Sequence, residues 1–425
     1  MRRLRISPNQ RFLQHEDGKP FFYLGDTAWE LFHKLDRDEI RHYADKRAQQ
    51  GFTVVQAVCL AELGGLRVPN REGHLPLHDN DPTRPNEAYF RLVDFAVETL
   101  AARGMWTGML PTWGDKFCKL WGEGPVIFNP ENAFVYGEWL SDRYAEAPII
   151  WILGGDRPAT DAFEVETVRA MAKGIRAGKG GHHLMSYHPR GEDSTTKYWP
   201  DEAWLDFHML QTGHVGPRRL TEEWIARDYA HKPTKPVMDA EPPYEDHPRM
   251  NSDWSSFDGY HDDLVVRQAA YGAVFTGAHG HTYGCHPVWQ MHHGGEPVNR
   301  ARRTWSEALD LPGAWQVGHL RRLMESLPFF SRIPASDIVL DQPSERLERA
   351  VATRDTEGSY AMVYTPVARP VSVDLGWAKA PLALSWFDPR SGQHGPGQQL
   401  DATSRATLTP PPTGPDWVAL LRPKS

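Results

Sequence analysis

Apolar and polar positions alternate in two different ways along the chain. Over roughly the first three quarters, short apolar runs are separated by segments in which apolar residues recur with helical period. Strands of a parallel sheet are covered on both faces and read as continuous apolar runs, so this pattern predicts repeated βα units. Eight runs are predicted strands, at 21–25, 53–59, 105–111, 149–154, 183–187, 204–209, 236–240 and 273–278. Helices are predicted at 36–50, 86–103, 132–145, 160–174, 221–231, 262–272 and 313–327, and the whole predicts a closed (β/α)8 barrel.

The pattern changes near residue 336. Short segments of strict alternation follow, with Gly and Pro between them, at 337–340, 347–353, 360–365, 371–374, 382–388 and 417–421. Such segments are typical of antiparallel strands with one buried face. The chain of 425 residues is long enough for a barrel of about 250 residues or more with a small module attached. We therefore expect an α/β TIM barrel over 1–335 and an antiparallel β-sandwich over 336–425.

Charge and cysteine content exclude several classes of partner. Lys and Arg total 47 against 55 Asp and Glu, a net charge of -8, with no basic run to neutralise a nucleic acid backbone. No window approaches 18 apolar residues, and the charged first residues are not followed by an apolar stretch, so we expect a cytoplasmic protein that binds neither nucleic acid nor membrane. The cysteines, three in number, are widely spaced and suit neither a disulfide framework nor a zinc motif.

Aromatic residues and histidine are abundant, with 16 Trp, 20 His and an aromatic share of 11%. Aromatic rings stack on the apolar faces of sugars, while His and carboxylates match sugar hydroxyls. A single Trp is more often a core residue, so its position in the fold decides whether it is a candidate for sugar binding. In a barrel the active site is built from the C-terminal ends of the strands, and nearly every predicted strand end carries an acid, a His or a Trp. This accumulation predicts a polar, aromatic-lined pocket for a carbohydrate.

Two acids at these strand ends are candidates for catalysis. Hydrolysis of a glycosidic bond requires one carboxyl group that donates a proton and a second that acts as nucleophile or base. Asp156 follows an apolar strand and two glycines, and Glu241 ends the seventh run and is followed by two prolines. Asp239, Glu245 and Asp246 compete on the same rim. The predicted substrate-binding residues are Asp26, Trp29, Glu87, Trp113, His188, His208, Gln211, Tyr244, His281, Tyr283 and Trp289.

Other chemistries lack their motifs. His279 and His281, His182 and His183, and the pair at 292–293 are close in sequence, but no H-E-x-x-H helix or thiolate cluster accompanies them, so no metal site is expected. No G-x-S-x-G elbow is present, which argues against a serine hydrolase. Neither a P-loop nor a G-x-G-x-x-G turn follows a strand, so no nucleotide cofactor is expected.

Several separate motifs in order resemble the apiosidase-like glycoside hydrolases. They are residues 12–29 ending in DGKPFFYLGDTAW, 51–56 (GFTVVQ), 85–90 (PNEAYF), 150–157 (IWILGGDR), 204–207 (WLDF), 211–214 (QTGH) and 235–242 (KPVMDAEP). The resemblance implies a retaining (β/α)8 hydrolase that releases apiose, a branched pentofuranose, from plant glycosides. It implies that Asp156 is the acid/base and Glu241 the nucleophile. The region after about 336 resembles a module of the collagen-binding type, and we carry no function over from that label.

One departure and two alternatives accompany this resemblance. Many related barrel glycosidases carry Asn-Glu at the fourth strand, where this chain has Gly155-Asp156, and the shorter acid must sit nearer the glycosidic oxygen. The same barrel acting on another plant glycoside, such as a β-xyloside, is one alternative. A non-catalytic carbohydrate-binding protein is the other. A cytoplasmic enzyme would meet small imported glycosides rather than intact pectin.

Overall fold

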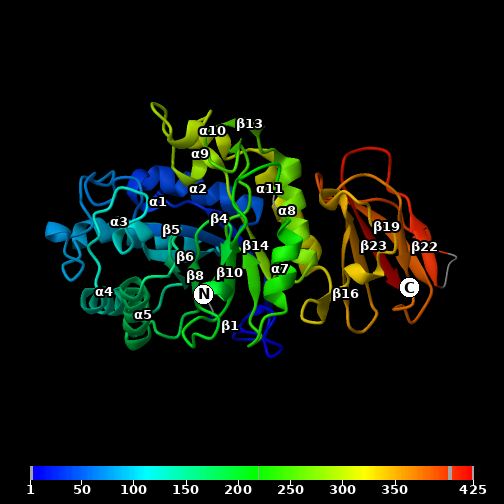
Figure 1. Ribbon diagram of the computed structural model, residues 1–425, viewed down its shortest axis with the longest axis horizontal. Coiled ribbons are helices and arrows are strands. Elements are labelled where there is room, and N and C mark those ends of the chain that lie inside the picture. Colours follow the sequence, from blue (N-terminus) through cyan, green and yellow to red (C-terminus); the bar gives the residue numbers. More distant parts are fainter. Residues whose placement is uncertain (1–2, 219, 401–403, 424–425) are drawn as a thin grey trace.

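The computed structural model describes residues 3–218, 220–400 and 404–423, and most of it is a curled parallel sheet ringed by helices (Figure 1). Six strands form one parallel sheet in the order β14-β4-β5-β6-β7-β8, and β10 pairs in parallel with β11. Their bounds are β4 Tyr23–Thr27, β5 Val54–Leu60, β6 Trp106–Thr112, β7 Ile149–Gly154, β8 Met185–His188, β10 His208–Gln211, β11 Val237–Asp239 and β14 Gly280–Tyr283.

Two backbone hydrogen bonds close the ring between the sheets. The amide of Asp206, just before β10, donates to the carbonyl of Met185 in β8 over 2.8 Å. On the other side the amide of His279 donates to the carbonyl of Val237 in β11 over 3.0 Å. Among the described residues the parallel strands therefore number eight, and the predicted barrel is confirmed.

Helices cover the outside of the barrel. The longer ones are α2 Arg37–Gln50, α3 Glu87–Ala101, α4 Pro130–Arg143, α5 Ala162–Ala177, α7 Thr221–Tyr229, α8 Asp263–Phe275 and α11 Pro312–Glu325, and the short ones are α1 Leu31–Lys34, α6 Thr195–Tyr198, α9 His286–Trp289 and α10 Trp305–Ala308. Helix α2 begins at a capping box between Asp36 and Glu39 and ends at Gly51, which has φ +93°. None of the helices in the described ranges is long and apolar enough to cross a membrane.

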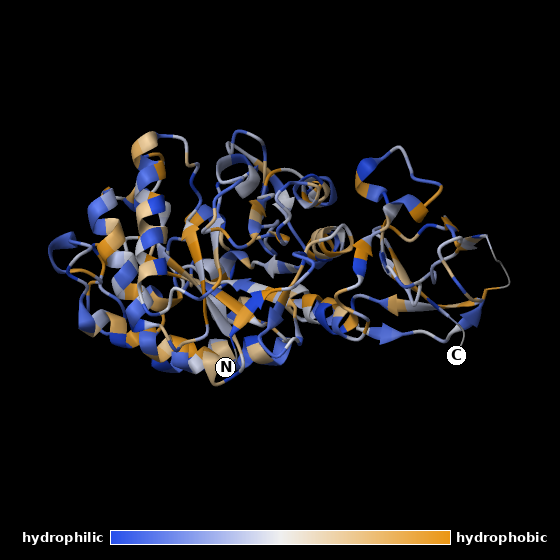
Figure 2. Ribbon diagram, turned by 90° about the horizontal axis from the view of Figure 1, so that it is seen from below, coloured by the Kyte–Doolittle hydropathy of each residue, from blue (hydrophilic) through white to orange (hydrophobic). Residues whose placement is uncertain are grey.

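The main core lies between the sheet and these helices, and a second apolar cluster fills the barrel interior. Figure 2 shows the apolar residues along the central strands and a mixture of polar and apolar residues on the helices. Small antiparallel pairs decorate the barrel, namely β1 Leu4–Ile6, β2 Leu13–His15 and β3 Pro20–Phe21, then β9 Asp193–Ser194 beside β10, and β12 Pro248–Met250 with β13 Phe257–Tyr260.

The prediction of the eighth strand was wrong. Residues 273–275 form the last turn of α8, and the strand is β14, which begins at Gly280. Helix α8 packs between the barrel, α11 and the C-terminal sheets, so it is apolar on nearly all sides and its end reads as a continuous apolar run. Such a run does not distinguish a buried helix from a buried strand. The sixth strand also starts later than predicted, at His208.

In the C-terminal part, the described residues form two antiparallel sheets that enclose an apolar cluster of their own. The larger sheet contains β15 Arg332–Pro334, β16 Val351–Asp355, β17 Ala361–Thr365, β23 Trp417–Pro423, β19 Leu382–Asp388, β20 Gln393–His394 and β21 Gln398–Gln399, and the smaller pairs β18 Val371–Asp374 with β22 Arg405–Leu408. Instead of the strand predicted over 337–340, Ser336–Ile338 is a 3₁₀ turn, and Val339 makes an isolated bridge to Val373. The division at 335/336 stays a prediction.

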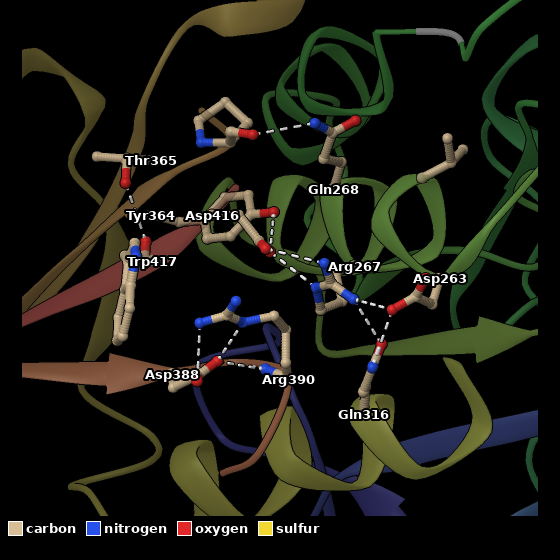
Figure 3. A network of polar contacts seen from close by, with 12 residues as sticks. Asp263, Arg267, Gln268, Gln316, Tyr364, Thr365, Asp388, Arg390, Asp416 and Trp417 are labelled. Carbon is tan, nitrogen blue, oxygen red and sulfur yellow. Dashed lines mark hydrogen bonds and ion pairs between the residues drawn. The ribbon is translucent and has the colours of Figure 1, made fainter. Parts of the chain in front are cut away.

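A buried ion pair ties the C-terminal sheets to the barrel (Figure 3). Arg267 on α8 donates through Nε and Nη2 to the two carboxylate oxygens of Asp416, over 2.8 and 2.9 Å. Tyr364 on β17 donates to the same carboxylate over 2.9 Å, and Gln316 on α11 accepts from Arg267. Both charged side chains are almost fully buried, and Asp263 of α8 also accepts from Arg267 Nη1 over 2.6 Å.

We expect replacement of Asp416 by alanine to lower the free energy of unfolding by about 3–5 kcal/mol, because it leaves Nε and Nη2 of the buried Arg267 guanidinium without an acceptor, while Asp263 and Gln316 contact only Nη1. The matched control is Arg346→Ala. Arg346 pairs with Glu223 of α7 across the same junction, but both side chains are roughly half exposed, so about 0–1 kcal/mol is expected. Urea denaturation of the two variants measures the difference, and equal losses would contradict this account.

Candidate active site

A cavity of about 710 Å³ lies at the C-terminal ends of the barrel strands. Its described walls come from the segments after all eight strands, so residues distant in sequence meet there. Lining residues include Trp29, Glu62, Trp113, Trp121, Asp156, Arg190, Glu192, Gln211, His214, Glu241, Tyr244, His247, Trp254, Trp289 and Asn299. The cavity is large enough for a small molecule and is rich in carboxyl groups, imidazoles and indoles.

Asp156 reaches the cavity through an unusual turn after β7. Gly154, Gly155 and Asp156 have φ values of +89°, +96° and +57°, a left-handed run that glycine adopts without strain and aspartate tolerates. A Cβ on Gly154 would lie 2.5 Å from the carbonyl oxygen of His188, so the turn also requires the missing side chain. The Asp156 carboxylate accepts from Trp121 Nε1 over 2.9 Å and from the Gly191 amide over 3.2 Å.

Glu241 lies two residues after β11 and is held between two imidazoles. His188 Nε2 is 3.1 Å from Oε2, and His214 Nε2 is 3.0 Å from Oε1. The Nδ1 atoms of the two rings accept from the backbone amides of Asp156 and Tyr244, each over 3.4 Å. A ring nitrogen that accepts carries no proton, so in each neutral ring the proton is on Nε2, the atom that lies beside Glu241. His214 is hydrogen-bonded to Oε1, and His188 lies within ion-pair distance of Oε2.

The two acids are shifted in opposite directions. Burial raises the pKa of Asp156 to about 6, and the negative charge of Glu241 adds to the shift. Burial opposes ionisation of Glu241 too, but the contacts from His188 and His214 outweigh it and lower its pKa below the usual range. Over a span of acidic pH, Asp156 is thus protonated while Glu241 is charged. One group can give a proton and the other can act as a nucleophile.

The competing acids on this rim serve other contacts and are not among the described residues that line the cavity. Asp239 is buried, which raises its pKa to about 7, and accepts from Thr212 Oγ1 over 2.6 Å. Glu245 accepts from Tyr283 over 2.6 Å and from the amide of Gly313 at the start of α11. Asp246 pairs with two arginines of the 300–303 loop. These acids hold loops in place.

Of the other predicted site residues, about half meet at the cavity. Trp29, Trp113, Gln211, Tyr244 and Trp289 line it, and His188 touches Glu241 as described. Asp26, Glu87, His208, His281 and Tyr283 lie elsewhere and are corrections to the predicted set.

The misplaced residues mostly face the helix layer. Asp26 is buried against α2, where Tyr43 and Arg47 donate to it, and Tyr283, its neighbour in register on β14, binds Glu245. His208 contacts Thr195 of α6 over 2.9 Å. Successive side chains of a strand point to opposite faces, so a residue at a strand end can face the helices instead of the rim.

Two further corrections complete the set. His281 is fully buried within β14. Glu87 is in the first turn of α3 and pairs with Arg143 of α4, on the outside of the barrel. Neither residue therefore reaches the cavity.

Several cavity residues were not predicted. Glu62 and His214 come two and three residues after strands β5 and β10, so the rule that found Asp156 also applies to them. Burial, together with the charges of Asp156, Glu30 and Asp115, raises the pKa of Glu62 to about 8. Trp121 and Trp254 lie in long loops, where no sequence signal placed them. Among the described residues, no group of three or more His, Cys, Asp or Glu is arranged to hold a metal ion.

Comparison with known proteins covers both parts of the chain. Residues 7–331 match the family "Apiosidase-like, catalytic domain" and residues 333–422 the family "Putative collagen-binding domain of a collagenase". A solved structure named "Glycoside hydrolase" is 29% identical with a TM-score of 0.89, over 100% of this chain and 97% of that one. A family 5 glycoside hydrolase from Bacteroides vulgatus is 29% identical with a TM-score of 0.88, over 99% and 94%. No curated protein matches the chain.

A more distant structure shares the fold alone. The family 5 mannosidase of Rhizomucor miehei is 14% identical, with a TM-score of 0.55 over 76% of this chain and 99% of that one. Its similarity is confined to the barrel architecture, so it says nothing about the sugar that enters this cavity.

Proposed function

Because the chain belongs to the apiosidase-like family of glycoside hydrolases, we propose that it cleaves glycosides of apiose or a related furanose, with Asp156 as acid/base and Glu241 as nucleophile. The observation that carries this proposal is the opposed state of two buried carboxyl groups in one cavity. Glycosidases separate their acid from their nucleophile in this way.

The proposed reaction proceeds in two steps with retained configuration. Glu241 attacks the anomeric carbon while protonated Asp156 gives its proton to the departing oxygen, which leaves a glycosyl ester on Glu241. Asp156, now ionised, takes a proton from water, and the water breaks the ester and restores both groups. Retention requires that the two carboxyl groups lie about 5–5.5 Å apart, and the anomeric configuration of the released sugar tests it.

The charges around the cavity favour a neutral sugar. Its described lining carries the acids Glu62, Asp156, Glu192 and Glu241, and the arginine Arg190, which already pairs with Asp193 over 3.1 Å. An anionic sugar at the inner end would add to the repulsion that already raises the pKa of Asp156 and Glu62. Apiose carries no charge, and its hydroxyl groups can donate hydrogen bonds to these carboxyl groups.

The test is a panel of aryl glycosides and plant glycans, with identification of the released sugar. We expect apiose to be released by the wild type and much less by Asp156→Asn from substrates with poor leaving groups. Release of xylose instead would assign the same chemistry to a different sugar. A carbohydrate-binding protein without activity would release nothing from any member of the panel, and that result would refute the proposal.

The histidine contacts to Glu241 predict a specific pH effect. The rate constant kcat/KM should fall as the pH rises through about 6, when Asp156 loses its proton, and at low pH when Glu241 gains one. His214→Phe keeps a ring but removes the donor to Oε1, so the pKa of Glu241 should rise. The acidic limb is then expected to move up by about 1–2 pH units.

The control for this measurement is His208→Asn, because His208 is also buried but lies outside the cavity. Its acidic limb should coincide with that of the wild type even if stability changes. His214→Gln, which keeps an amide donor, should fall between the wild type and His214→Phe. An acidic limb that stays in place in His214→Phe would show that the imidazole does not set the charge of Glu241.

A further inference from the structure

Trp121 stands at the cavity directly beside the proposed acid. Its Nε1 donates to Asp156 Oδ2 over 2.9 Å, and yet 42% of the residue is exposed. Among the described large apolar side chains that are exposed, Trp121 and Trp254 are the two that line the cavity. An exposed indole held at a cavity is a surface for a ring to stack on.

The indole is fixed on one side. The guanidinium of Arg157 lies 4.3 Å from the ring centre, and Arg157 itself is fully buried. It donates to the carbonyls of Cys118, Asp156 and Trp121. Arg157 covers one face of the indole, so a ring that stacks on Trp121 must approach the opposite face.

The loop that carries Trp121 is anchored as well. Lys116 Nζ donates to the carbonyl of Ala61 over 2.8 Å, and the amide of Gly124 donates to Asp115 Oδ2 over 2.7 Å. The amide of Ile127 donates to the carbonyl of Lys116 over 2.9 Å. The indole therefore needs little reordering when a ligand arrives, which favours binding.

We propose that the face of Trp121 opposite Arg157 is the subsite for the leaving group, and that it takes a neutral ring with a flat apolar face. This inference rests on the proposed function, because Asp156 must lie within hydrogen-bond reach of the oxygen that departs. Trp121 already contacts Asp156. The first ring of the leaving group, which is attached to that oxygen, then lies against Trp121. A phenolic ring and a pyranose ring share the required chemistry.

Binding of the leaving group alone tests the subsite without any turnover. The probes are 4-nitrophenol and methyl β-D-glucopyranoside, titrated at pH 5 into the full chain and followed by ligand-observed NMR. Trp121→Ala should weaken binding of the ring that the site prefers by about tenfold, while Trp121→Phe, which keeps a ring, should lose less. Trp315→Ala removes an exposed indole on α11 beside Lys46, away from the cavity, and should change nothing. If Trp121→Ala weakens the binding of just one of the two probes, that probe shows whether the leaving group is a phenol or a pyranose.

Kinetics separate the two roles of Trp121, which are to donate a hydrogen bond to Asp156 and to stack on the leaving group. Both Trp121→Phe and Trp121→Ala remove the N–H donor to Asp156, so in both the basic limb of kcat/KM should move to higher pH. Only Trp121→Ala should also lose about tenfold in kcat/KM on the aryl glycoside relative to the methyl glycoside of the same sugar. Unchanged probe binding in Trp121→Ala, or an equal loss in Trp315→Ala, would overturn the subsite. Absence of turnover by the wild type would instead refute the proposed function, and the binding result would still decide the subsite.

Discussion

Replacement of Glu241 by glutamine is expected to lower turnover of every substrate by about 10⁴-fold or more, because an amide cannot form the glycosyl ester through which both steps proceed. The effect should be the same for good and poor leaving groups, since the bond to the anomeric carbon is lost in each case. Steady-state rates on the best substrate of the wild type measure it. Glutamine has nearly the same size and shape as glutamate; its amide oxygen can accept from one of the two imidazoles of His188 and His214, and its NH2 group faces the other ring.

The matched control is Glu245→Gln, four residues further along the same loop. Glu245 is also buried, which raises its pKa to about 7, but it faces Tyr283 and the start of α11 instead of the cavity. Its replacement should leave activity within about tenfold of the wild type. If Glu241→Gln kept activity comparable to Glu245→Gln, Glu241 would not be the nucleophile.

Replacement of Asp156 by asparagine is expected to slow substrates with poor leaving groups by about 10²–10⁴-fold and to affect good leaving groups much less. A good leaving group departs without a proton, so the first step hardly needs Asp156. A plot of kcat/KM against the pKa of the leaving group should therefore steepen in the variant. A uniform loss over the whole series would contradict the assignment of Asp156 as the acid.

Added azide distinguishes the two roles a second time. In Asp156→Gly it should restore activity and give a glycosyl azide of retained configuration, because the small anion replaces the activated water of the second step. The two roles would be exchanged if azide rescued Glu241→Gly and did nothing for Asp156→Gly. The anomeric configuration of the glycosyl azide, determined by NMR, shows which of the two residues has each role.

The local pattern of apolar and polar residues was enough to predict those elements whose burial can be read from neighbouring positions in the sequence. The strand at 149–154 was predicted with its exact bounds, because a strand covered on both faces shows a continuous apolar run. The same reasoning placed Asp156 and Glu241 at the cavity, since both follow such runs directly. It was wrong at 273–275, where a helix surrounded by other elements is apolar for the same reason as a strand.

The sequence by itself determined the barrel, the antiparallel C-terminal sheets and the two cavity acids, because these depend on short-range periodicity and on the rule that sites lie at strand ends. Only the tertiary structure decided which way each side chain faces. Asp26 and Tyr283 turn toward the helices, and Trp121 reaches the cavity from a long loop. The convergence of His188 and His214 on Glu241 required three strands to lie side by side, and the charge of Glu241 depends on that convergence.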